Sequence, residues 1–290
     1  MKKILTFLVR LLCLSLLCGQ VLAQRTMLNM NSQSKNPLNK RTPPPISKDK
    51  EIIKVIDSIY NPAGNAQGYN QKMQCWLLRE GNNAIFCMKL VQTIRVKPEG
   101  LPASTYVVLA GSQYDRQFKR VDYHAANGMV GLVKIGATSG GVTQVAYDKA
   151  IPAGSWGDAP ESIVLFQAGP LGRMGWAIES GYMGQGYLEG GINIYVPFGN
   201  AVASVGGVLT VSNNEGACSV EDAKSQQCVL QAYEAYVTAD VSRSEGLLYP
   251  LIANVKNEIN GKVTRKRVEI PFSIASDRYV PPENMKESLN

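Results

Sequence analysis

The chain has 290 residues, 18% of them charged, and a formal net charge of +7 at pH 7. The excess positive charge lies near the N-terminus: residues 1–23 hold three basic residues, residues 24–50 hold six against Asp49 alone, and the remainder carries −1. A nucleic-acid-binding protein places its basic residues on the folded surface that follows the phosphates, so this distribution excludes nucleic acid as the main partner.

Residues 1–23 are typical of a secretory signal peptide. Basic residues stand at the start, an apolar stretch begins at Leu11, and residues 21–23 have the small or branched side chains of a cleavage site. We expect cleavage between Ala23 and Gln24. The segment 11–23 has thirteen residues, whereas a helix that spans a bilayer needs about 20. The mature protein is therefore expected to be periplasmic, surface-attached or secreted, with no transmembrane segment.

The next segment, residues 24–50, is expected to be a disordered basic tether. It is rich in Asn, Ser, Gln, Lys and Pro, includes Pro43-Pro44-Pro45, and has few side chains that could join a core. A β-rich globular body is expected at 51–275 and a flexible tail at 276–290. The body is long enough for one domain or for two, with a boundary near 150–160 or 212–218.

The body begins with a helical pattern and continues with strand patterns. Ile52, Ile56 and Ile59 recur at helical spacing, and Asn61-Pro62 ends the run, so we expect a short helix within 47–60. Short apolar or alternating runs separated by Gly, Pro, Asn and Asp then predict strands at 73–79, 84–96, 104–110, 129–135, 142–147, 161–168, 174–180, 191–197, 201–211, 228–241, 246–259 and 262–274.

This succession predicts a mainly β fold. The expected architecture is an antiparallel β-sandwich, one large or two small, with a short N-terminal helix and local disulfides. The clearest hairpin lies near the end of the body, where apolar residues alternate on both sides of Asn260-Gly261. That dipeptide adopts the left-handed conformations of a two-residue hairpin turn.

Four cysteines remain after signal cleavage, and an even number in an exported chain favours disulfides. The strands at 74–79 and 84–89 form a hairpin that places Cys75 close to Cys87. Cys218 and Cys228 then close a polar loop, in which we expect one helical turn, because a continuous helix would hold them about 15 Å apart. Metal binding is disfavoured because the chain has one histidine and no closely spaced cysteines. No cofactor is expected.

Sequence motifs for catalysis are weak. Residues 153–157 resemble a nucleophile elbow, yet Pro160 follows where a helix is required and the single histidine, His124, lies upstream. Residues 136–141 lack the Gly-Lys-Ser/Thr ending of a phosphate-binding loop. We interpret both segments as turns, and His124 as a surface histidine without a role.

Paired carboxylates are the one form of catalysis that needs no motif. Asp158 with Glu161, or Glu179 with Glu189, are candidate pairs for a glycoside hydrolase. Pairs of this kind also arise by chance among the 22 acidic residues of positions 51–290. Whether the protein is an enzyme stays open, with a non-enzymatic role favoured.

The segment 169–191 combines many glycines with aromatic residues. Trp176, Tyr182 and Tyr187 offer amphipathic faces suited to sugars, peptides or proteins, and Trp156 lies close before this segment. These four aromatic residues are the candidate binding residues. Structural loops around buried aromatics are the competing interpretation.

The last predicted strand begins with a basic run. Its residues are Lys262, Arg265, Lys266 and Arg267. Such a run usually protects an exposed edge strand from aggregation, and its functional alternative is contact with an acidic partner or an anionic glycan.

Two functional hypotheses follow from these patterns. The first is an exported, non-enzymatic β protein that binds or assembles with a protein of the cell envelope or surface, a role compatible with an oligomer. The second is a carbohydrate-directed module, either lectin-like or a hydrolase that uses two carboxylates.

Overall fold

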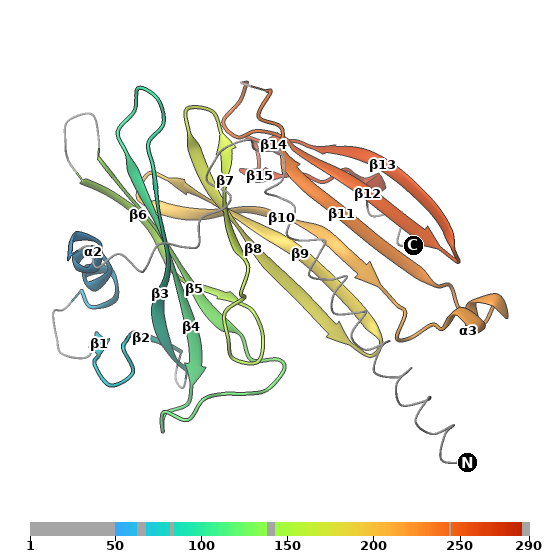
Figure 1. The fold of residues 1–290 in the computed structure, drawn as a ribbon, viewed down its shortest axis with the longest axis horizontal. Helices are drawn as coiled ribbons and strands as arrows, with labels where there is room; N and C mark the ends of the chain where they lie inside the picture. The colour runs from blue at the N-terminus through green and yellow to red at the C-terminus, as the bar shows by residue number, and fades with distance from the viewer. Residues whose placement is uncertain (1–49, 63–67, 82–83, 138–142, 244, 286–290) are drawn as a thin grey trace, which may run out of the picture.

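The computed structural model describes residues 50–62, 68–81, 84–137, 143–243 and 245–285 (Figure 1). The expected signal peptide 1–23, almost all of the tether 24–50 and the last five residues of the expected tail lie outside these residues. Strands dominate the described part of the chain, and most of them belong to one large sheet.

The strands follow one another with few helices between them. In chain order they are β1 (Tyr69–Asn70), β2 (Cys75–Glu80), β3 (Ala84–Val96), β4 (Ser104–Tyr114), β5 (Gly128–Ala137), β6 (Thr143–Ala153), β7 (Ile163–Gly169), β8 (Arg173–Gly184), β9 (Tyr187–Phe198), β10 (Ala201–Asn213), β11 (Gln231–Ala239), β12 (Leu251–Ile259), β13 (Lys262–Ile270), β14 (Phe272–Ser273) and β15 (Arg278–Tyr279). The helices are α2 (Lys50–Tyr60), α3 (Val220–Lys224) and the 3-10 turn η3 (Glu283–Met285).

Each strand expected from the sequence overlaps one of the strands β2 to β13. The hairpin β12–β13 turns at Asn260-Gly261, whose φ angles of 47° and 81° match the conformation expected of that dipeptide. The expected strand 262–274 is divided at Pro271 into β13 and β14, and the two-residue strands β1 and β15 were not expected, because two residues carry no detectable alternation.

The strands fall into three groups that share one hydrogen-bonded sheet (Figure 1). Strands β1 to β6 pair with their sequence neighbours, β7 to β10 do the same, and β11 to β13 form the third group. The groups meet at β10. One of its edges pairs with β9, and the other edge pairs with β6 at Ala201 and with β11 at Val211–Asn213. Strands β1 to β13 are thus joined by continuous hydrogen bonding, and β14 pairs with β15 in a separate small sheet.

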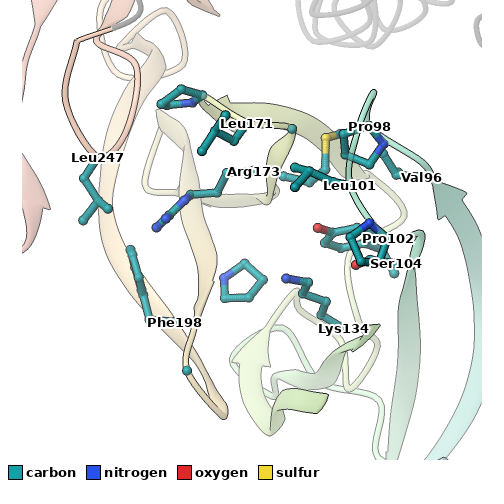
Figure 2. Close-up of a pocket in the computed structure, with 16 residues that line it drawn as sticks. Val96, Pro98, Leu101, Pro102, Ser104, Lys134, Leu171, Arg173, Phe198 and Leu247 are labelled. Atoms are coloured by element: carbon teal, nitrogen blue, oxygen red, sulfur yellow. The ribbon is translucent and has the colours of Figure 1, made fainter. Parts of the chain in front are cut away.

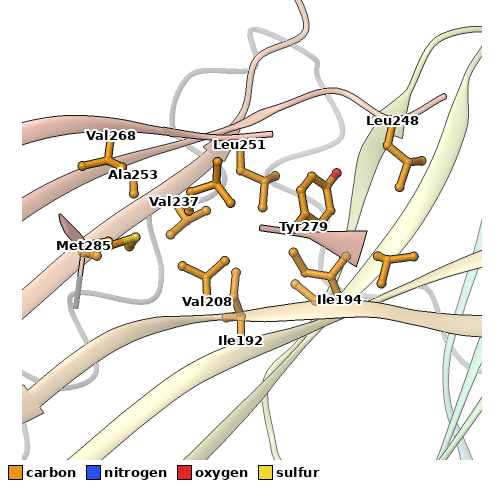
Figure 3. Packing of buried hydrophobic residues seen from close by; sticks show 14 of the residues in the cluster. Ile192, Ile194, Val208, Val237, Leu248, Leu251, Ala253, Val268, Tyr279 and Met285 are labelled. Atoms are coloured by element: carbon orange, nitrogen blue, oxygen red, sulfur yellow. The ribbon is translucent and has the colours of Figure 1, made fainter. Parts of the chain in front are cut away.

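Side chains of the middle group alternate between two cores. Trp176 and Ile178 of β8 pack with β4, β5 and β6, whereas Ala177 between them packs with the third group. Figure 3 shows the second of these cores, in which Ile194 of β9 and Val208 of β10 face residues of β12 and β13. The alternation follows from the two-residue period of a strand, so the middle group is apolar on both faces.

Helix α2 covers the remaining face of the first group. Ile52, Ile56 and Ile59 are buried against strands β2 to β5, as their helical spacing requires. The Trp76 indole N–H donates to the Asp57 carboxylate at 2.5 Å and so links β2 to the helix.

Residues 276–285 pack against the body, although the sequence analysis placed them in a flexible tail. Tyr279 is 2% exposed, and its hydroxyl donates to the Tyr249 carbonyl at 2.9 Å. Met285 is also buried in the core shown in Figure 3. Polar residues precede Tyr279 and prolines follow Val280, so no alternating or helical pattern indicated this packing.

Both expected disulfides are present. Cys75 and Cys87 link β2 to β3 with their Cα atoms 5.3 Å apart, and Cys218 and Cys228 are linked at 5.9 Å. The second bridge encloses α3, which begins at the Ser219 cap and contains no buried residue. Among the described helices, none has the length and apolarity needed to cross a membrane.

We predict that the two disulfides contribute unequally to global stability. Replacing both Cys75 and Cys87 by Ala should lower the free energy of unfolding by about 2–4 kcal/mol, because the bridge restricts the unfolded chain and its sulfur atoms are buried. Replacing Cys218 and Cys228 by Ala should cost less, since the exposed segment around α3 can open without the cores. Chemical denaturation measures both losses, and an equal or larger loss at 218–228 would contradict this ranking.

Candidate functional site

Three aromatic side chains from separate parts of the chain meet on the surface. The ring of His124 lies 5.4 Å from Trp156 and 6.1 Å from Tyr182, measured between centroids, and both contacts are edge to face. Trp156 is 50% exposed and Tyr182 is 55% exposed. We call His124, Trp156 and Tyr182 the aromatic cluster.

Trp156 projects from a turn with an unusual backbone. Its φ angle is +57°, and the nearby Gly154 and Gly157 also have positive φ angles. A Cβ atom on Gly154 would collide with the Asp158 carbonyl, and one on Gly157 with the Val121 carbonyl, so the turn requires both glycines. Bulky residues rarely adopt a positive φ, and such strain is concentrated at functional sites.

Hydrogen bonds fix this turn to the end of β4 and to the segment 115–127 that joins β4 to β5. The Gly157 N–H donates to the Ala126 carbonyl at 2.8 Å, and the Gln113 N–H donates to the Gly157 carbonyl at 2.7 Å. Arg120 forms an ion pair with Asp158 across the same junction. The positions of Trp156 and His124 are therefore set by backbone contacts rather than by their own side chains.

Tyr182 enters the cluster from the far end of β8. It lies on the same face of the strand as the buried Trp176 and Ile178, but beyond the point where that core ends. Met183 and Tyr187 at the β8–β9 turn are also exposed, at 68% and 51%. Tyr187 shares the face of Tyr182 and continues the exposed aromatic surface onto the tip of this hairpin, whereas Met183 points to the other face.

The four candidate binding residues do not share one location. Trp156 and Tyr182 belong to the aromatic cluster and Tyr187 lies on the adjoining turn, whereas Trp176 is completely buried and touches Tyr106. Trp176 is therefore part of the core and not of a surface. No local pattern indicated that His124 lies beside Trp156 and Tyr182, because both of its ring partners are distant in the chain.

The basic run lies on an edge strand, as its composition suggests. β13 ends the path of paired strands, and Lys262, Arg265 and Arg267 are exposed on it. Nearby Glu269 pairs with Arg243 at 2.9 Å. Charged side chains along such an edge oppose pairing with another strand.

The candidate carboxylates differ in their placement on the fold. Glu189 lies directly opposite Tyr182 and shares its face, whereas Glu179, three residues before Tyr182, points to the other face of the sheet. Asp158 is already engaged by Arg120. Within the described ranges, no group of three or more His, Cys, Asp and Glu side chains could hold a metal ion.

Comparison with known proteins identifies no relative. No protein-family model, curated protein or solved structure matches the chain significantly. The site must therefore be interpreted from its own geometry.

We predict that Glu179 destabilises the fold at neutral pH. Partial burial raises the pKa of this carboxyl, and a hydrogen bond from Ser162 offsets part of the rise. A carboxyl whose pKa is higher in the folded than in the unfolded protein favours folding while it is protonated. This contribution is lost as the pH rises through the folded-state pKa. Glu179→Gln should therefore raise Tm at pH 7, with a gain that shrinks towards acid pH.

The exposed Glu189→Gln serves as the matched control, since it removes the same charge from the same hairpin. Its thermal melts should change little across this range. A gain for Glu179→Gln that persists unchanged in acid would refute the assignment to carboxyl burial.

Proposed function

We propose that this chain is an exported, non-enzymatic binding protein that uses the aromatic cluster to dock a protein of the cell envelope or surface. The observation that carries the proposal is Trp156, half exposed on a strained turn and packed against His124 beside Tyr182. An exposed tryptophan contributes little to folding, so a strained turn that presents it to solvent favours a role in binding.

The energetics of protein interfaces support this role. Trp and Tyr are enriched among the few residues that dominate binding energy, because they bury a large area with few rotatable bonds. Here the backbone contacts of the turn already restrict Trp156, which lowers the entropy cost of association. The exposed Tyr187, on the same face as Tyr182, extends the apolar area around the cluster.

In this proposal the body is a β-sandwich that serves as a rigid scaffold. The packed cores on both faces of β8 support its exposed end, where Tyr182 lies. The basic residues of β13 keep the open edge soluble and face an acidic region of the partner or of its surroundings.

A carbohydrate ligand is the second candidate function. Exposed aromatic faces such as those of Trp156 and Tyr182 also suit sugar rings, and the same cluster would bind them. The separation of Glu179 and Glu189 on opposite faces makes binding without hydrolysis the form of this alternative that the geometry favours.

We predict that a photo-crosslinking amino acid at Tyr182 captures a surface or envelope protein in intact cells. The same substitution at Tyr147, an exposed tyrosine of β6 outside the cluster, should capture none. Adding Trp156→Ala should abolish the adduct at 182 by removing the largest contact, while leaving thermal unfolding unchanged.

Glycan binding provides the deciding comparison for the same variants. Binding to a glycan array that requires Trp156, without a protein adduct, would replace the protein partner by a carbohydrate. Equal crosslinking from 147 and 182, or no Trp156-dependent binding in either assay, would overturn the role of the cluster.

The expected cleavage of the signal peptide can be tested separately. Mass spectrometry of the protein recovered from its native host should give a mature N-terminus at Gln24, because signal peptidase cleaves after small residues such as Ala23. Recovery of the chain with its first 23 residues attached would contradict export through a cleaved signal.

A further inference from the structure

A cavity of about 530 Å³ lies at the opposite end of β8 from the aromatic cluster (Figure 2). Its volume falls within the range of about 300–1,000 Å³ that is usual for small-ligand sites. It is formed by the end of β3 and the segment after it, by β4 and β5, by the β7–β8 and β9–β10 turns, and by Leu247.

Two cationic side chains reach into this cavity from different strands. Figure 2 shows Lys134 of β5 and Arg173 of β8 extending into the same hollow. No acidic residue is among the described residues that line it. Nor does either cation take part in an ion pair with any carboxylate in the described part of the chain.

The two positive charges are close enough to affect each other. Burial lowers the pKa of the Lys134 ammonium, and the positive charge of Arg173 lowers it further. Partly buried charges of like sign raise the free energy of the folded protein unless an opposite charge lies beside them. An anion placed between Lys134 and Arg173 would supply that charge.

Apart from Ser104 and Tyr106, the other side chains that line the cavity are apolar. The guanidinium carbon of Arg173 lies 5.6 Å from the centroid of the Phe198 ring, a cation–π contact that holds its planar donors in one orientation. Besides Phe198, apolar side chains dominate the lining; they include Val96, Pro98, Leu101, Met174, Pro197 and Leu247. A ligand that fills the space therefore needs an apolar part beside its charged group.

Leu171, at the mouth of the cavity, is unusual in its exposure and in its backbone conformation. Its side chain is 83% exposed and its φ angle is +56°, so the β7–β8 turn holds a large apolar group in solvent with a strained backbone. The positive φ angles of Leu171 and Gly172 suit a two-residue hairpin turn, but the fold gains nothing from a leucine side chain exposed there. A bound apolar chain would cover Leu171 and account for it.

From these observations we infer that the cavity binds an amphipathic organic anion. Lys134 and Arg173 hold its carboxylate or phosphate head by charge-assisted hydrogen bonds, and the proline and leucine walls enclose its apolar chain. Such an anion could come from a free fatty acid or from a lipid phosphate. The site is separate from the aromatic cluster and does not depend on its partner.

Calorimetric titration of the full chain with three eight-carbon probes tests the inference. Octanoate and octyl phosphate, below their micelle-forming concentrations, should bind, whereas octanol should bind at least tenfold more weakly because it lacks the charge. The tighter of the two anions identifies the source of the ligand. No binding of either anion, or equal binding of octanol, would overturn the inference.

Variants locate the binding in this cavity. Lys134→Gln and Arg173→Gln should each weaken binding of both anions at least tenfold, whereas Arg265→Gln, which removes a positive charge from exposed β13, should change it less than twofold. Equal weakening by Arg265→Gln would show that net charge alone is responsible.

Leu171→Asp tests the mouth of the cavity without changing a buried side chain. The side chain is exposed, so the fold should tolerate the change, and the new carboxylate at the mouth should repel the anion. Unchanged anion binding in Leu171→Asp, together with unchanged binding in a folded Arg173→Gln, would place the anion elsewhere.

Discussion

The arrangement of the sheet depends on one edge of β10. Because β9 occupies the other edge along the strand, β6 and β11 must share what remains, one at each end. Irregularities in register between Ser204 and Gly207 and between Leu209 and Val211 interrupt the pairing between these two junctions. Bulges of this kind bend a strand, which allows the first and third groups of strands to pack on opposite faces of the middle group.

The middle group must therefore be apolar on both faces, and its register cannot vary. A slip of one residue in β8 would exchange Trp176 with Ala177 and place each in a core of the wrong size. This constraint makes the centre of β8 rigid and leaves its two ends for other roles. The Arg173 end reaches the cavity and the Tyr182 end reaches the aromatic cluster, about 30 Å apart along an extended strand.

Local signals in the sequence were sufficient to predict strands β2 to β13, the Asn260-Gly261 turn and both disulfides, because each depends on residues close together in the chain. The aromatic cluster and the cavity, in contrast, are formed by residues that are distant from one another in the chain. Trp176 and Tyr182 are aromatic and share a face of β8, yet one is buried and the other exposed, according to where β4 to β6 end. The cavity brings together five separate segments, which no local pattern could indicate.

The sequential pairing of the first group has a consequence for the order of folding. Strands β1 to β6 pair only with one another until β10 arrives, so their hydrogen bonds can form without any residue after Ala153. Helix α2 can cover one face of these strands, but the face with Tyr106, Val130 and Leu132 stays open until β8 packs on it. A chain that folds in this order exposes an apolar sheet for a time, and binding by a chaperone at that stage would prevent aggregation.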